Sequence, residues 1–424
     1  MSLNFSKVVE LINQKKFYDS LKLLDQMEQD NKEDFQILNF KGFVLLNIYE
    51  FEKSIKYFTK ALTKKDDSFL TLCYRSEAYT EMGNFNNALI DLQKAQNINS
   101  RSHEVCFSIG DCYSNLGDNN KAIEFFRKTL ELKPDFKIAI ENLITKLAEI
   151  NSVRDSENIY IKVNSNINDI NYFYSNNEFI KDDLIKDIFN KSNALIVKNF
   201  KNLSSSQTQI YRRNNENLNC DRHFRVFNNF MAIPKYCFSC FKVTIEINNV
   251  LNLIKLYLIF DNINLKNNNI RKCMIESRPD VKGFYKGFIY CKSLEEAENI
   301  KSKLEIIIKE NIGPNIFIEI KRGCTEFGVK YPSYKYLKGE VMKYNENWSK
   351  FETTVDKKFP KFTVNTKIRQ SKKGLNLRDI LIIKNWLYFA KLINDQSYKK
   401  ISEDNIINDF IKEKFSEKVK KINN

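Results

Sequence analysis

The sequence is poor in residues that break regular structure and in long apolar runs. It has 11 glycines and 6 prolines among 424 residues, with 42% hydrophobic and 29% charged residues. This composition excludes collagen-like and proline-rich disordered chains and is typical of a globular, soluble protein. No run of 18 apolar residues occurs. The longest candidate, residues 250–260, contains Asn252 and Lys255 and is too short to span a bilayer.

Several common catalytic signatures are also missing. The chain has no glycine-rich phosphate loop, no Gly-x-Ser-x-Gly elbow and no His-Glu-x-x-His motif. Their absence favours a role other than catalysis without deciding it. Residues 1–16 lack the uninterrupted apolar core of a secretory signal, so we expect a cytoplasmic protein whose nine cysteines are reduced thiols.

One pattern recurs four times at a spacing of 34 residues over the first 150 residues. The seventeenth, twentieth and twenty-fourth places carry, with one exception at Asn119, a large aromatic, a small and a large apolar residue. They are Phe17, Phe51, Phe85 and Asn119, then Ser20, Ser54, Ala88 and Ala122, then Leu24, Phe58, Leu92 and Phe126. Small side chains let two helices approach closely, so each unit is expected to be a pair of antiparallel helices. A period held over four units predicts a stacked array.

This pattern resembles the tetratricopeptide repeat family. Further signature positions agree: Gly42 and Gly110 at the eighth place, Ala61 and Ala95 at the twenty-seventh, and Pro134 closing the fourth unit. The resemblance implies an α-solenoid that serves as a scaffold for protein binding. Its expected parts are four helical hairpins over residues 1–34, 35–68, 69–102 and 103–136, and a capping helix over 137–150.

The resemblance also places the first helix of each unit on a concave, peptide-binding surface. The thirteenth place reads Asn13, Asn47, Glu81 and Asn115. An amide both donates to and accepts from a peptide backbone, so this ladder suits an extended peptide; an Asn-rich composition is the alternative explanation. Arg75 is the one basic residue there that could stand in for a carboxylate clamp. The other expected groove residues are Asn39, Phe43, Glu77, Phe107 and Asp111.

The net charge of +15 is concentrated after the repeats. Residues 1–150 hold 20 Lys and Arg against 22 Asp and Glu, and the remaining residues hold 48 against 31. This excess favours an anionic partner for the second half, with a solvated lysine-rich surface as the alternative. We expect a linker and accessory segment over 151–215, with a helix at 182–191 and a strand at 194–200. Residues 336–424 are expected to be a basic helical region, with helices at 377–394 and 405–420.

Helical and strand periods alternate over residues 216–335. Strands are expected at 241–247, 271–277, 284–291 and 316–322, and helices at 250–262 and 294–311. The order β-α-β-β-α-β predicts a ferredoxin-like α+β domain, with both helices on one face of a four-stranded antiparallel sheet. The chain is therefore expected to be a protein-interaction array joined to a basic α+β domain of unassigned role.

Two short motifs in this domain have the spacing of a tetrahedral zinc site, which makes zinc a possible cofactor. Its ligands would be Cys220, His223, Cys237 and Cys240. An enzyme or zinc metalloprotein centred here, with the repeats recruiting its substrate, is thus the alternative to a pure interaction protein. Burial of the thiols in a core is a simpler explanation, and an iron–sulfur centre using Cys273 or Cys324 is a further one.

A second alternative is RNA binding through the sheet face opposite the helices. The stretch from Lys286 to Tyr290 is similar to the third-strand signature of RNA-recognition motifs, whose aromatics stack on bases. The candidate contacts are Lys272, Lys286, Phe288, Tyr290 and Lys321. Three carboxylates on the same face, Glu246, Glu276 and Glu319, would oppose the approach of phosphate.

Overall fold

The computed structural model describes residues 5–31, 33–150, 157–170, 179–364, 370–403 and 407–423. The chain divides into two compact units, and each is assembled from three stretches of sequence. The first unit consists of Met1–Leu143, Asn219–Phe230 and Asn347–Lys367, and the second of Ile144–Leu218, Met231–Glu346 and Ile368–Asn424. The sequence predicts contiguous domains, whereas both units take up segments from distant parts of the chain.

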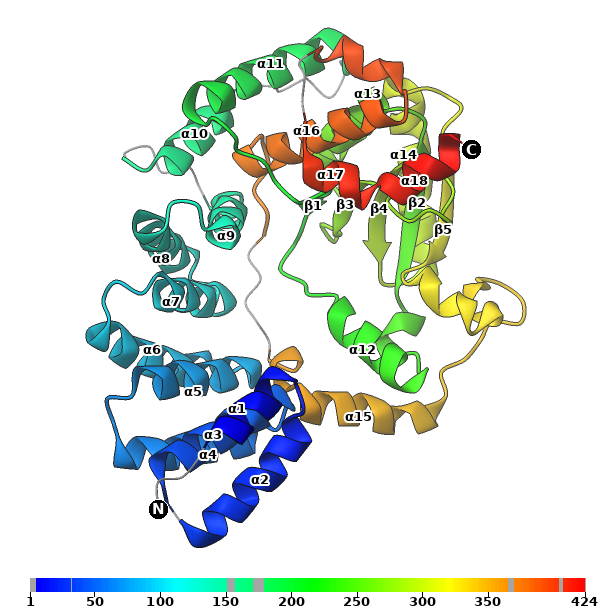
Figure 1. Ribbon diagram of the computed structural model, residues 1–424. Helices are drawn as coiled ribbons and strands as arrows, with labels where there is room; N and C mark the ends of the chain where they lie inside the picture. Colours follow the sequence, from blue (N-terminus) through cyan, green and yellow to red (C-terminus); the bar gives the residue numbers. More distant parts are fainter. Residues whose placement is uncertain are drawn as a thin grey trace. The chain divides into compact units, whose positions relative to one another are not determined.

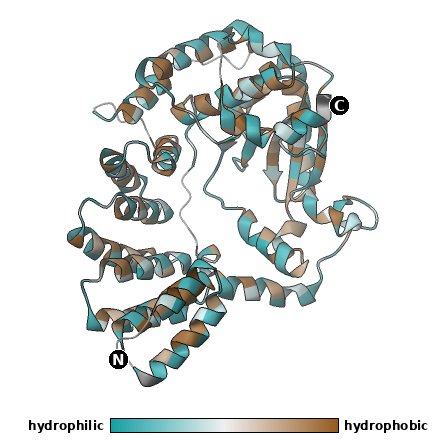
Figure 2. Cartoon of the chain, in the orientation of Figure 1, coloured by the Kyte–Doolittle hydropathy of each residue, from teal (hydrophilic) through white to brown (hydrophobic). Residues whose placement is uncertain are grey.

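The first unit begins with an array of paired helices (Figure 1). The helices are α1 (Ser6–Asn13), α2 (Phe17–Asp30), α3 (Phe35–Asn47), α4 (Phe51–Lys64), α5 (Phe69–Glu81), α6 (Phe85–Ile98), α7 (His103–Asn115) and α8 (Asn119–Leu132), followed by α9 (Lys137–Leu147). The second helix of each pair begins at the seventeenth place of its repeat, which confirms the 34-residue period. Hydrophobic and hydrophilic residues alternate along these helices, as expected where one side is buried (Figure 2).

Two glycines show why the eighth place of the repeat matters. Gly42 on α3 faces the ring of Phe58 on α4, and a Cβ at position 42 would lie 2.6 Å from that ring. Gly110 on α7 stands in the same relation to Phe126 on α8, at 2.7 Å. The hydroxyl of Ser54 donates a hydrogen bond to the carbonyl oxygen of Gly42, 2.8 Å away. The helices of a pair therefore approach so closely that the phenylalanine ring fills the space that a side chain at the glycine position would need.

Two later segments complete the first unit. They are α12 (Cys220–Phe230) and α15 (Ser349–Lys358), the latter followed by a 3-10 turn, Pro360–Phe362. Arg222 on α12 donates to Asp356 of α15 at 2.6 Å and to Glu352 at 3.0 Å. The rings of Phe230 and Phe351 stack with centroids 4.8 Å apart. These contacts join α12 and α15 into a helix pair that the sequence reasoning did not predict.

The second unit is built on a five-stranded antiparallel sheet in the order β1-β3-β4-β2-β5. The strands are β1 (Gln209–Arg212), β2 (Phe241–Ile247), β3 (Arg271–Ile275), β4 (Tyr285–Cys291) and β5 (Phe317–Arg322), and the sheet helices are α13 (Val250–Asn262) and α14 (Leu294–Asn311). The bounds of β2, α13 and α14 agree with the sequence prediction, and β3, β4 and β5 are one or two residues shorter. Strand β1 was not predicted.

Helix α13 covers one face of this sheet. A Cβ on Gly287 of β4 would lie 2.4 Å from Leu256 on α13, and Val243 and Ile289, on the same face, are fully buried. Because side chains alternate along a strand, Thr244 and Phe288 point to the opposite face. Phe288, a candidate RNA contact, therefore lies on the sheet face opposite α13.

The remaining helices of the second unit are α10 (Ile159–Asn168), α11 (Asp182–Asn199), α16 (Leu377–Leu392), α17 (Asp409–Lys414) and α18 (Ser416–Asn423). The predicted strand at 194–200 is wrong, because α11 continues through it and buries Ile185, Phe189 and Ile196 at helical spacing. Helix α10 lies within the range expected to be a linker. Within the described ranges, no helix is long and apolar enough to cross a membrane.

Candidate functional site

The predicted ladder of groove residues stands at the ends of the first helices. Asn13, Asn47, Glu81 and Asn115 are the last residues of α1, α3, α5 and α7. The amide nitrogen of Asn47 donates to the carbonyl oxygen of Phe43, and that of Asn115 to the carbonyl oxygen of Asp111, both at 2.9 Å. The nitrogen of Asn115 also reaches Oδ2 of Asp111 at 3.2 Å. Each amide thus donates within its own helix and keeps its oxygen for a further partner.

The side chain of Arg75 forms its hydrogen bonds within the array. Its guanidinium makes two hydrogen bonds to the buried carboxylate of Asp91, at 2.7 and 2.6 Å, and one to Thr59 at 3.0 Å. It therefore does not supply a positive charge for a peptide carboxylate. Burial and the neighbouring charge of Glu81 raise the pKa of Glu77. The predicted groove residues that are not ion-paired within the array are acidic or neutral.

The other groove residues fix the walls of the array. The ring of Phe43 packs edge-on against Tyr74 with centroids 4.9 Å apart, and Phe107 packs against Phe126 at 5.7 Å. The side-chain oxygen of Asn39 accepts a hydrogen bond of 2.9 Å from Thr71 in the next repeat. The assignment of these residues to a peptide-binding groove stays a prediction, since their contacts serve repeat packing.

A part of the chain itself lies against the ends of α3 and α5. Residues 358–364, which we call the resident segment, run from the end of α15 through the 3-10 turn. Lys361 donates from Nζ to Oε1 of Glu81 at 2.6 Å, and the ring of Phe359 meets Tyr49 edge-on with centroids 5.6 Å apart. A Cβ on Gly83 would lie 2.3 Å from Cγ2 of Val364. We call Tyr49, Glu81 and Gly83 the helix-end surface.

Helix α12 holds the resident segment from its other side. The guanidinium of Arg225 lies 4.4 Å from the ring centroid of Phe359 and 5.3 Å from that of Phe362. Asn219 donates from Nδ2 to the carbonyl oxygen of Phe362 at 2.8 Å. The resident segment is thereby held by the ion pair with Glu81, by the cation–π contacts of Arg225 and by a hydrogen bond from the side chain of Asn219 to its backbone.

Tyr49 and Gly83 were missed by the sequence reasoning, although the repeat carried a signal for both. The fifteenth place of each unit has positive φ, at Lys15 (58°), Tyr49 (67°), Gly83 (71°) and Gly117 (76°). Glycine adopts this conformation without strain, and two of the four units have it. A glycine recurring at a 34-residue interval marks the turn between paired helices, which is where the helix-end surface lies.

The four residues of the zinc prediction fall in different units. Cys220 and His223 lie one turn apart on α12, whereas Cys237 and Cys240 belong to the second unit. Throughout the described part of the chain, no group of three or more His, Cys, Asp or Glu side chains could hold a metal ion. Cys237 is 1% exposed, and Sγ of Cys240 packs against Gly323, where a Cβ would lie 2.4 Å away. The zinc and iron–sulfur predictions thus find no support in this arrangement.

The sheet face predicted to bind RNA carries the expected residues, but its aromatic residue Phe288 is buried. Phe288 is 6% exposed, and the ammonium groups of Lys242 and Lys272 lie 5.2 and 5.0 Å from its ring centroid. Lys286 pairs with the buried carboxylate of Glu276 at 3.7 Å. On the same face Lys321 pairs with Glu319 and Tyr290 is partly exposed. A base could stack on Phe288 only after a lysine moves away, so RNA binding stays a prediction.

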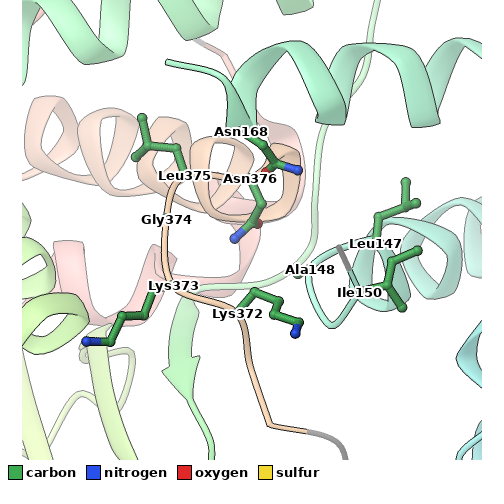
Figure 3. A pocket seen from close by; sticks show the side chains of 9 residues that line it. All are labelled: Leu147, Ala148, Ile150, Asn168, Lys372, Lys373, Gly374, Leu375 and Asn376. Carbon is green, nitrogen blue, oxygen red and sulfur yellow. The ribbon is translucent and has the colours of Figure 1, made fainter. Parts of the chain in front are cut away.

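A pocket of about 320 Å³ lies in the second unit (Figure 3). It is bounded by the ends of α9 and α10 and by the loop that precedes α16. Its lining residues are Leu147, Ala148, Ile150, Asn168, Lys372, Lys373, Gly374, Leu375 and Asn376. The backbone nitrogen of Lys372 donates to the carbonyl oxygen of Ala148 at 3.4 Å, and Asn376 caps α16 by accepting from the backbone nitrogen of Asp379 at 2.9 Å. The pocket combines apolar walls with two lysines and two amides.

Comparison with known proteins gives a match to one family model and matches to several solved structures. The sequence model of the tetratricopeptide repeat matches residues 103–136. A crystal structure of MamA is 18% identical and covers 34% of this chain and 84% of that chain, with a TM-score of 0.32. MamA 41-end from Desulfovibrio magneticus RS-1 is 17% identical, covers 33% and 78%, and has a TM-score of 0.32. YrrB, described as a TPR protein with an unusual peptide-binding site, is 20% identical, covers 33% and 73%, and has a TM-score of 0.31.

Proposed function

Since the helical array is a tetratricopeptide repeat segment, we propose that the protein is an interaction protein whose array holds an extended peptide along the ends of its first helices. The observation that carries the proposal is the resident segment itself. The resident segment rests on the helix-end surface through the ion pair of Lys361 with Glu81 and through the edge-on contact of the rings of Phe359 and Tyr49. A surface that accommodates one such segment has the shape and polarity to accommodate another.

The amide ladder supplies the second contact for a bound peptide. The side-chain oxygens of Asn47 and Asn115 accept no hydrogen bond from any described residue, and both stand at the same level of their repeats. A peptide backbone that follows the ladder would donate to both oxygens. These hydrogen bonds would involve only the backbone of the peptide, so the ladder would not discriminate between peptide sequences.

Replacement of Asn47 and Asn115 by alanine tests the proposal. Each lost hydrogen bond is worth about 0.5–1.5 kcal/mol, so the double variant should bind peptides roughly ten-fold more weakly or worse. The measurement is binding of the full chain to an array of immobilised ten-residue peptides. The matched control is Asn199→Ala with Asn262→Ala, because these helix-terminal asparagines make the same bond four residues back outside the array. Equal signals from both double variants would contradict the ladder.

For the second unit we propose a ferredoxin-like core formed by β2 to β5 with α13 and α14. Two facts support it: the chain order β2-α13-β3-β4-α14-β5 and the sheet order β3-β4-β2-β5. Strand β1 then extends the sheet beyond β3. This core carries no catalytic assignment.

A second candidate function is binding of a small anionic ligand in the pocket of Figure 3. The favouring observation is that Lys372 and Lys373 share the pocket with the amides of Asn168 and Asn376. Ammonium and amide groups together donate to phosphate or carboxylate oxygens. Titration of the full chain with inorganic phosphate and pyrophosphate, followed by thermal unfolding, tests this function. Lys372→Ala with Lys373→Ala should abolish any stabilisation, whereas Lys198→Ala with Lys201→Ala should preserve it.

A further inference from the structure

We infer that the helix-end surface recognises a basic segment that combines lysine with an aromatic residue, and that the resident segment is a built-in occupant that such a partner displaces. The inference rests on the proposed function of the array and adds to it the chemistry of the partner and a control on access. It is drawn from the contacts of Lys361, Phe359 and Val364 with the helix-end surface.

The acceptor for the lysine is the carboxylate of Glu81, which has a second carboxylate, that of Glu77, one turn away. Glu77 and Glu81 stand one turn apart on α5, and their mutual repulsion, added to burial, raises the pKa of Glu77. Arg75, two residues before Glu77, is already neutralised by Asp91. An ammonium group that reaches Glu81 therefore relieves an uncompensated negative charge, and Lys361 does this at 2.6 Å. A peptide with an acidic or neutral residue at this place would leave the repulsion in force.

The aromatic preference comes from the turn between α3 and α4. Tyr49 has positive φ and is 51% exposed, so its ring projects from the turn rather than into the core. The ring of Phe359 meets that of Tyr49 edge-on, and the ammonium of Lys358 lies 5.5 Å from the ring centroid of Tyr49. Both contacts use the face or edge of one ring, so an aromatic residue next to a lysine is the matching feature of a partner.

The size of the adjoining site is set by Gly83. Its φ of 71° and the closeness of Val364 mean that only a residue without a side chain fits at this position. The Cα of Lys361 would also lie 3.3 Å from a Cβ at position 83. The backbone of the resident segment thus runs directly over a glycine, which gives the surface room for any peptide backbone in the same path.

Access is governed by competition within one chain. A tethered segment acts at an effective concentration in the millimolar range. A free peptide of the same sequence can therefore bind only those molecules in which the resident segment has left the helix-end surface. A change that weakens the resident contact without altering the helix-end surface must tighten binding of the free peptide. The increase cannot exceed the factor by which the resident segment is weakened.

The test uses the full chain and a fluorescent synthetic peptide with the sequence of residues 355–364. The variant Lys361→Glu loses the pair with Glu81 and places another carboxylate beside Glu81, so we expect the peptide to bind about five- to ten-fold more tightly than to the wild type. The matched control is Lys357→Glu, an exposed lysine with the same charge change. Hydrogen exchange of residues 358–364 should rise in Lys361→Glu and stay unchanged in the control.

Adding Glu81→Gln to Lys361→Glu identifies the site. The gain in peptide affinity should be lost in this double variant, while circular dichroism stays as in the single variant. Equal peptide affinity in the wild type, Lys361→Glu and Lys357→Glu would overturn the inference, as would a gain that survives Glu81→Gln. If exchange rises in Lys361→Glu but the peptide binds no variant, the partner chemistry is wrong. The peptide-array experiment on Asn47 and Asn115 then still decides the proposed function separately.

Discussion

The guanidinium of Arg212 donates a hydrogen bond of 2.8 Å to the carboxylate of Asp379, although both side chains are almost entirely buried. Arg212 ends β1 and Asp379 lies in the first turn of α16, so the bond joins elements 167 residues apart. The same guanidinium pairs with the buried carboxylate of Asp261 on α13 and donates to the hydroxyl of Tyr257 at 2.9 Å. One cation therefore links a strand and two helices of the second unit.

Arg212→Met should destabilise the second unit by about 3–5 kcal/mol, because two buried carboxylates lose their counter-charge. Urea unfolding followed by tryptophan fluorescence measures this, since Trp386 lies in the core of the same unit. Arg213→Met removes an exposed guanidinium and should cost less than about 1 kcal/mol. Similar losses for the two variants would show that the buried pairs contribute little.

Gly42→Ala should destabilise the array by about 1–3 kcal/mol, because the new Cβ collides with the ring of Phe58. Adding Phe58→Leu should return part of this loss by making room for the methyl group. Thermal unfolding by circular dichroism measures both, with the exposed helical change Gln36→Ala as control. Gly42→Ala without effect would mean that the packing of α3 against α4 tolerates an added methyl group.

Lys242→Met should stabilise the second unit at neutral pH. Burial lowers the pKa of the Lys242 ammonium, an effect that Glu326 partly offsets. A base with a depressed folded pKa destabilises the fold while it is charged. That cost is full below the folded pKa and vanishes as pH approaches the ordinary lysine value of 10.5.

The rise in melting temperature caused by Lys242→Met should therefore shrink from pH 7 towards pH 10. Lys321→Met, on the same sheet face but half-exposed and paired with Glu319, should give no such pH-dependent gain. A gain for Lys242→Met that grows with pH would mean that burial does not lower the pKa of this ammonium group.

Cys237→Ser should cost about 1–3 kcal/mol, the penalty for a hydroxyl placed among buried atoms. A chelator added to the wild type should leave the melting curve unchanged, because the described residues form no metal-binding group. A downward shift with chelator, together with stoichiometric zinc in elemental analysis, would restore the four-ligand hypothesis.

The array was the most predictable part of the fold. Its pattern occurs four times, so one repeat that departs from the pattern, as at Asn119, is still recognised from the other three. The bounds of α13 and α14 were also predicted correctly, since each begins at a polar cap. Asn249 accepts from the backbone nitrogen of Asn252, and Ser293 from that of Glu296. These signals are local, and local signals survive in a single sequence.

The errors come from short segments with an ambiguous local pattern and from segments whose structure depends on distant partners. The apolar stretch at 194–197 is equally consistent with a short strand and with part of a buried helix, and only the spacing from Ile185 through Phe189 shows that it continues α11. Strand β1 has four residues and owes its position to pairing with β3. The contact of Lys361 with Glu81 joins residues 280 apart, and no local pattern points to it.

The first unit is assembled from three separate stretches of sequence, and these stretches are synthesised one after another. Helices α1 to α8 leave the ribosome well before residues 358–364 are made, and at about 5–20 residues per second the interval from Gly83 to Val364 lasts roughly ten to sixty seconds. During that interval the nascent array presents Tyr49 and Glu81 without their later occupant. A partner that engages the growing chain therefore meets no competitor, whereas one that arrives after synthesis must evict the resident segment.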